Sequence, residues 1–87
     1  MEREIIDFWG DGCGNCAVLA PIIDKIALEH ADIKITKLNV KDSEDQAAKY
    51  GVSSLPTLVF LRDGAEVAKM TGLKPKTLIE KKIAEVF

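Results

Sequence analysis

The stretch that most constrains the fold of this 87-residue chain runs from Asp7 to Pro21. Here an apolar strand-like run gives way to a turn and then to a helical pattern, and both cysteines, Cys13 and Cys16, lie at the junction. Free N–H groups and the positive end of the helix dipole favour a thiolate there, and the thiolate is the form that attacks disulfides. Residues i and i+3 share a helix face, so the two thiols can close a small ring. The stretch therefore predicts thiol–disulfide exchange at a helix start.

Length and composition limit the classes of protein that this chain can belong to. Its 87 residues predict one domain, and 47% hydrophobic with 30% charged residues is typical of a globular protein. With a net charge of −2, the chain lacks the basic surface that is typical of nucleic-acid-binding proteins. Its apolar runs are too short to cross a membrane. The N-terminus has no apolar segment typical of a signal peptide, so we expect a cytoplasmic protein. In that compartment a cysteine pair is more often catalytic or metal-binding than structural.

Apolar periodicity predicts an α/β protein with the element order β-α-β-α-β-β-α. Strands are expected at residues 2–9, 33–39, 57–61 and 66–70, and helices at 15–29, 43–50 and from 75 to the C-terminus. The first strand, helix and strand predict a right-handed βαβ unit with parallel strands. Arg62-Asp63-Gly64 carries a hairpin signal, so the last two strands should pair antiparallel. The fold class is a four-stranded mixed sheet with helices on both faces.

Local signals set the ends of the helices. Asp11 can cap the first helix, and Pro21 inside it predicts a kink rather than a stop because the apolar period resumes beyond it. Ser43 and Gln46 fit a capping box at the start of the second helix. Gly51 supplies its left-handed stop.

The residue pattern leaves two roles open. Asp7 interrupts the first strand, so it either ends the strand and faces water or is a buried proton acceptor beneath the cysteines. The alternative interpretation is that the thiols bind a metal, but His30 would lie roughly 21 Å beyond Cys16 along an unbroken helix. A closed four-ligand zinc site would then need a second chain, so we expect no metal and no cofactor. His30 is expected to be a solvated residue at the helix end.

Several dispersed motifs, in the right order, resemble the thioredoxin family over nearly the whole chain. They are Asp7-Phe8-Trp9, Cys13-Gly14-Asn15-Cys16 with Pro21 five residues on, Lys37-Leu38-Asn39-Val40, Tyr50-Gly51-Val52, Leu55-Pro56-Thr57 and Gly72. The resemblance implies a single thioredoxin-like domain over residues 1–87. It also implies the strand order 2-1-3-4, with the third and fourth strands antiparallel to the first two.

The same resemblance implies a role for each matched position. Cys13 would be the exposed attacking thiol and Cys16 the buried resolving thiol with which it forms a disulfide. Asp7 would move protons to and from Cys16, and Lys37 would adjust the charge of Asp7, although a strand-end lysine can also simply be solvated. Seven residues would border the groove for a protein-disulfide substrate: Trp9, Gly12, Gly14, Asn15, Leu55, Pro56 in the cis form, and Gly72. Trp9 has an alternative interpretation as a core residue. A flavin-dependent thioredoxin reductase using NADPH would supply the electrons. Apart from the resemblance, a monomer is the expected oligomeric state by default.

Three departures distinguish this chain from the usual family pattern. The matches begin at the family's second strand, so we expect its opening strand and helix to be missing. Gly12 stands where a tryptophan is usual, and Asn15 stands where a proline is usual. Two alternatives to a protein-disulfide reductase therefore stay open: a glutaredoxin-like, glutathione-dependent reductase, and a binding module that uses the groove for docking.

Overall fold

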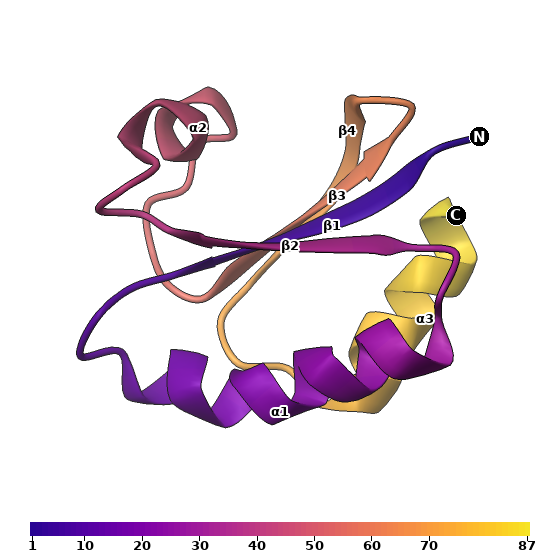
Figure 1. Ribbon diagram of the computed structural model, residues 1–87, viewed down its shortest axis with the longest axis horizontal. Helices are drawn as coiled ribbons and strands as arrows, with labels where there is room; N and C mark the ends of the chain where they lie inside the picture. The colour runs from indigo at the N-terminus through magenta and orange to yellow at the C-terminus, as the bar shows by residue number, and fades with distance from the viewer.

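A four-stranded mixed sheet separates two layers of helices in the computed structural model, which describes all 87 residues. Helices α1 and α3 lie on one face of the sheet, and the short α2 lies on the other (Figure 1). The order and type of all elements are as predicted from the sequence. Their bounds are β1 Arg3–Trp9, α1 Gly14–Glu29, β2 Lys34–Asn39, α2 Glu44–Lys49, β3 Thr57–Arg62, β4 Ala65–Thr71 and α3 Lys76–Val86. None of the helices combines the length and apolarity that crossing a membrane requires.

The strand order β2-β1-β3-β4 confirms the expected order. Strand β1 pairs parallel with β2 and antiparallel with β3, and β3 pairs antiparallel with β4. Strand β4 therefore runs parallel to β1, and the expectation that both later strands oppose the first two is wrong for β4. The chain reverses at Asp63 and Gly64, where both residues have positive φ, as a two-residue type I′ hairpin requires.

Strand β1 is buried on both faces, as its apolar run predicted. Ile5 packs into the cluster beneath α1 and α3, whereas Ile6 and Phe8 pack into the cluster on the α2 face. Side chains of a strand alternate between its faces, so Asp7 points to the same face as Ile5, toward α1. The alternation of β1 thus sets a carboxylate beneath the helix that carries the cysteines.

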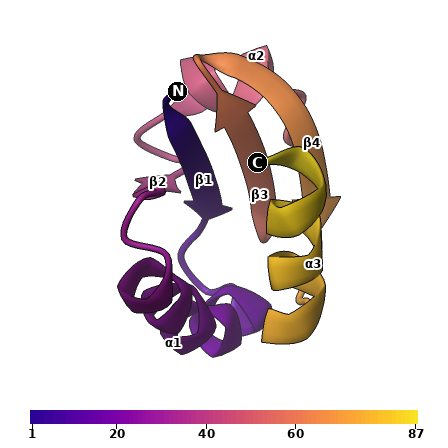
Figure 2. The same ribbon diagram turned by 90° about the vertical axis from the view of Figure 1, so that its right-hand side faces the viewer.

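Two apolar clusters hold the layers together. The larger joins the sheet to α1 and α3, which pack against each other (Figure 2). Its members are Ile5, Leu19, Ile23, Ile26, Ile33, Leu58, Phe60, Ile79 and Ile83. The smaller, on the α2 face, contains Ile6, Phe8, Ala47, Val59 and Leu61.

Two of the expected helix caps are not formed by the predicted side chains. The N-cap of α1 is Cys13 rather than Asp11, because Gly12, with φ +74°, turns the chain between them. Asp11 instead accepts a 3.4 Å hydrogen bond from Asn39. Ser43 is the N-cap of α2, but its side chain makes no capping hydrogen bond, so the capping box does not form.

Pro21 lies inside an uninterrupted α1, so it does not stop the helix.

We predict that Leu19→Ala lowers the free energy of unfolding by about 2–5 kcal/mol, because truncating a buried leucine removes apolar contacts and leaves a cavity. Leu19 is 1% exposed in the larger cluster, whereas Leu28 on the same helix is 84% exposed. Leu28→Ala is therefore the matched control, with an expected change within about 0.5 kcal/mol. Urea unfolding of both oxidised variants measures the two values. Equal losses would contradict the assignment of this core.

Candidate active site

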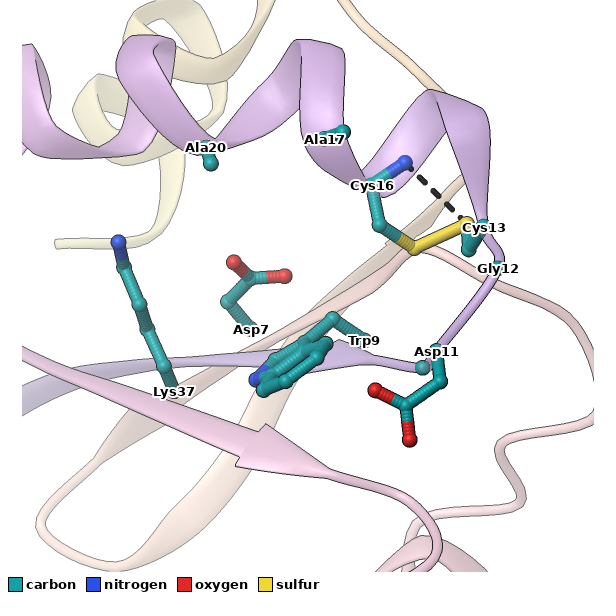
Figure 3. A pocket seen from close by; sticks show the side chains of 10 residues that line it. Asp7, Trp9, Asp11, Gly12, Cys13, Cys16, Ala17, Ala20 and Lys37 are labelled. Atoms are coloured by element: carbon teal, nitrogen blue, oxygen red, sulfur yellow. Dashed lines mark hydrogen bonds between the residues drawn. A yellow bond between two sulfur atoms is a disulfide. The ribbon is translucent and has the colours of Figure 1, made fainter.

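Helix α1 begins at the cysteine pair. Cys13 is its N-cap, and the Cys13 Sγ accepts a 3.2 Å hydrogen bond from the Cys16 backbone N–H (Figure 3). The two residues form a disulfide, with their Cα atoms 5.3 Å apart. Cys16 is buried and Cys13 is partly exposed. In the reduced protein the same N–H group and the helix dipole would stabilise a thiolate on Cys13.

A pocket of about 520 Å³ lies beside the disulfide, between the start of α1 and the ends of β1 and β2 (Figure 3). Six of its lining residues were expected at the site from the sequence: Asp7, Trp9, Gly12, Cys13, Cys16 and Lys37. Four others were not: Gly10, Asp11, Ala17 and Ala20. The pocket therefore brings the cysteines, the carboxylate and the lysine to one space.

Asp7 is a buried carboxyl group rather than a strand end that faces water. The residue is 4% exposed, and its Oδ1 has no hydrogen-bond partner. Burial raises the pKa of Asp7 above its usual value, the charge of Lys37 opposes that rise, and the charge of Asp24 adds to it. In Figure 3 the carboxylate points from β1 toward α1, on the side where Cys16 lies. Such a group can hold a proton at a higher pH than an exposed aspartate can.

Lys37 lies opposite Asp7 in the parallel pairing of β1 with β2. Its ammonium donates a 2.6 Å hydrogen bond to Asp24 Oδ1 on α1 and forms no ion pair with Asp7. Asp24 was not recognised as a site residue from the sequence. The signal was its spacing: Cys16, Ala20 and Asp24 follow one another at intervals of four residues, which places them along one face of the helix.

The expected groove residues fall into three places. Trp9 and Gly12 line the pocket, and Gly14 and Asn15 are exposed in the first turn of α1. Outside the pocket, the loop before β3 meets the loop after β4, and these loops carry Leu55, Pro56 and Gly72. The Leu55–Pro56 peptide bond is cis, and Gly72 donates a 2.8 Å backbone hydrogen bond to the carbonyl of Pro56.

Gly10 lines the pocket and was not expected at the site from the sequence. A Cβ atom at this residue would lie 2.7 Å from Leu55 Cδ1, a distance that real Cβ contacts do not reach. A larger residue at this position would therefore require the Leu55 side chain to shift. The available signal was a glycine directly after a buried strand.

His30 lies at the C-cap of α1, at the other end of the helix from the cysteines. It is not simply solvated, because its Nε2 lies 3.1 Å from Glu80 Oε2 on α3. Donor atoms of Glu29, His30 and Glu80 all lie within 4.8 Å of one another, which is a spacing that a metal ion can use. Lys76 forms an ion pair with Glu29, so an ammonium already neutralises part of this cluster. The group ties α1 to α3 and does not contribute to the pocket.

Comparison with known proteins gives a consistent result. A family model described as Thioredoxin matches residues 1–85. The chain is 35% identical to thioredoxin of Alicyclobacillus acidocaldarius over 84 residues, covering 95% of this chain and 80% of that protein. It is 43% identical to Haemophilus influenzae thioredoxin over 74 residues, covering 84% and 69%. The X-ray structure of Fasciola hepatica thioredoxin superposes with a TM-score of 0.92 and 32% identity, covering 99% of this chain and 82% of that one.

We predict that Asp7→Asn raises the free energy of unfolding near neutral pH. The raised pKa of Asp7 means that the folded protein holds the proton more tightly than the unfolded chain does. Unfolding then releases a proton between the two pKa values, so stability falls as the pH rises through that window. Each unit between the folded and unfolded pKa corresponds to about 1.4 kcal/mol. The neutral amide of asparagine does not pay this ionisation penalty.

Urea unfolding of the oxidised protein and its Asp7→Asn variant, measured across the pH range, tests this prediction. The difference in free energy should be largest at neutral pH and should shrink toward zero below about pH 3.9, the pKa of an unfolded aspartate. A variant that is less stable than the parent at neutral pH would show that Asp7 is not a destabilising buried charge.

Proposed function

Because the chain belongs to the thioredoxin family and is a protein-disulfide oxidoreductase, we propose that Cys13 is its attacking thiol and Cys16 its resolving thiol. The observation that carries this assignment is their unequal exposure at one helix start: Cys13 is the partly exposed N-cap, and Cys16 is buried beside Asp7. A substrate disulfide reaches the exposed sulfur first, and the buried sulfur is protected from solvent until it is needed.

The exchange proceeds in two displacement steps. The Cys13 thiolate attacks one sulfur of the substrate disulfide, so a Cys13–substrate bond forms and the other substrate sulfur leaves as a thiolate. The Cys16 thiolate then attacks the Cys13 sulfur and releases the second substrate sulfur. Two electrons have passed from the cysteine pair to the substrate, and the pair is left as a disulfide.

Asp7 is the proton acceptor for Cys16 in this proposal. Its carboxylate shares the pocket with Cys16, and its raised pKa brings its basicity closer to that of a thiol. When Cys16 must become a thiolate, Asp7 takes the proton and later returns it to solvent or to a leaving thiolate. The stabilised Asp7→Asn variant should therefore exchange more slowly near neutral pH, and an unchanged rate would refute this role.

The Cys13–Cys16 disulfide must be reduced again before the next cycle. Relatives named thioredoxin support a flavin-dependent thioredoxin reductase as the electron donor. A pair that reduces other disulfides needs a compartment that keeps thiols reduced, which supports the cytoplasm. A monomer is the proposed active form, because Cys13, Cys16 and Asp7, the groups that the two displacement steps need, line one pocket and require no residue from a second chain.

We predict that Cys16→Ser accumulates a covalent mixed disulfide with a protein-disulfide substrate, because the first displacement proceeds and the second has no nucleophile. Turnover should be lost. The matched control is Cys13→Ser, which should form no such adduct. Non-reducing gels and intact-mass measurement detect the adducts. If Cys13→Ser accumulates the adduct and Cys16→Ser does not, the two assigned roles are reversed.

We also predict that NADPH and a flavin-dependent thioredoxin reductase sustain the reduction of a protein disulfide by this protein. The rate should rise in proportion to the concentration of this protein, as expected if the monomer is active. Glutathione with glutathione reductase, in place of the thioredoxin reductase, should support little turnover. Following NADPH consumption measures both reactions. Efficient turnover with glutathione alone would favour the glutaredoxin-like alternative instead.

A further inference from the structure

The Lys37–Asp24 ion pair spans the pocket from β2 to α1. Lys37 and Asp7 are register partners on adjacent strands, yet the Lys37 ammonium binds Asp24 Oδ1 at 2.6 Å. Asp7 Oδ1 meanwhile stays buried without a hydrogen-bond partner. The cation that shares the pocket with the buried carboxylate is therefore engaged by a second carboxylate on the helix.

Few charged groups face Asp7 from the elements around it. Strand β2 contributes Lys37, the only cation that lines the pocket, and the loop after β1 contributes Asp11. Helix α1 contributes Asp24 and the two cysteines, whereas β3 places the apolar Leu58 opposite Asp7. The position of the Lys37 ammonium is thus the main adjustable electrostatic influence on Asp7.

We propose that Asp24 is a positioning residue for the exchange reaction: it holds the Lys37 ammonium at the helix side of the pocket and withholds it from Asp7. The proposal rests on the proposed role of Asp7 as the proton acceptor of Cys16. An ammonium with three donors and a flexible stem pairs with whichever carboxylate offers the better site. Asp24, which is exposed and needs no desolvation, offers that site without burying a charge.

Holding Lys37 in this way has a chemical consequence. A general base is most effective when its pKa lies near the working pH. An ammonium paired directly with Asp7 would stabilise the carboxylate form, which would make Asp7 a weaker base toward Cys16. Asp24 therefore lets the protein keep a lysine at the pocket without neutralising the proton acceptor.

The test is the titration of Asp7 in the oxidised protein, where the disulfide removes the cysteines from the titration. The side-chain carboxyl signal of Asp7, assigned with the Asp7→Asn variant, is followed by carbon NMR in the parent and in Asp24→Asn. Removing the Asp24 charge and freeing Lys37 both favour ionised Asp7. The midpoint should therefore fall in Asp24→Asn by ~0.5 pH unit, a shift of the size that an exposed ion pair produces.

Asp32→Asn is the matched control. Asp32 pairs with Arg3 at the same 2.6 Å distance, and its side chain is 60% exposed against 64% for Asp24. The substitution changes the net charge equally but does not touch the pocket, so the Asp7 midpoint should not move. An unchanged or raised midpoint in Asp24→Asn, or an equal fall in Asp32→Asn, would overturn the proposal.

A second variant separates positioning from a simple charge effect. In a Lys37→Met background no ammonium is left to be released, so Asp24→Asn should lower the Asp7 midpoint by less than it does in the parent. An equal fall in both backgrounds would overturn the positioning role.

The pH profile of disulfide reduction gives an independent result. If Asp24→Asn shifts the Asp7 midpoint but leaves the pH profile of the rate unshifted, proton transfer by Asp7 is refuted and the positioning of Lys37 by Asp24 still holds.

Discussion

The structure depends on the central position of β1. This strand is hydrogen-bonded to β2 on one edge and to β3 on the other, and it is covered by helices on both faces. A strand so enclosed has no exposed edge or free face, so its apolar side chains are fully used in packing. It forms a fixed platform from which the chain leaves directly toward the cysteines.

The extensive packing of β1 explains how the strand can include Asp7, a carboxyl group whose burial is unfavourable. Ile5, Ile6 and Phe8 are almost completely buried, and the apolar contacts that they make offset the cost of Asp7 between them. A buried carboxyl at this position is therefore compatible with a stable fold. In the proposed mechanism the proton-acceptor role of Asp7 and the stability of the fold make opposite demands on this residue, and the apolar contacts around it offset the cost of burying it.

The sequence predicted the parts of this protein that depend on local pattern. The apolar run before the cysteines, the helical period after them and the Asp63-Gly64 turn each gave the right element in the right place. The direction of β4 relative to β1 was mispredicted, although it follows from the antiparallel pairing on each side of β3.

Features that depend on contacts between distant segments were beyond sequence reasoning. Asp24 was unremarkable as one acidic residue on a helix, because its ion pair with Lys37 forms only when the fold brings β2 beside α1. Asp11 was expected to cap the helix because its residue type suits that position. A turn before the helix was expected from the sequence, but the residue that caps the helix was not: with the positive φ of Gly12 between them, Cys13 rather than Asp11 takes the N-cap position.

The hydrogen bond from the Cys16 N–H to the Cys13 sulfur gives one side chain two duties. The sulfur that we propose as the attacking atom also satisfies a free donor at the helix end, so deleting it affects structure and reactivity together. Alanine at this position would remove a nucleophile and a cap together, whereas serine keeps an acceptor for the N–H group. Among replacements of the nucleophile, an oxygen in place of sulfur is thus the change that isolates the chemical contribution from the structural one.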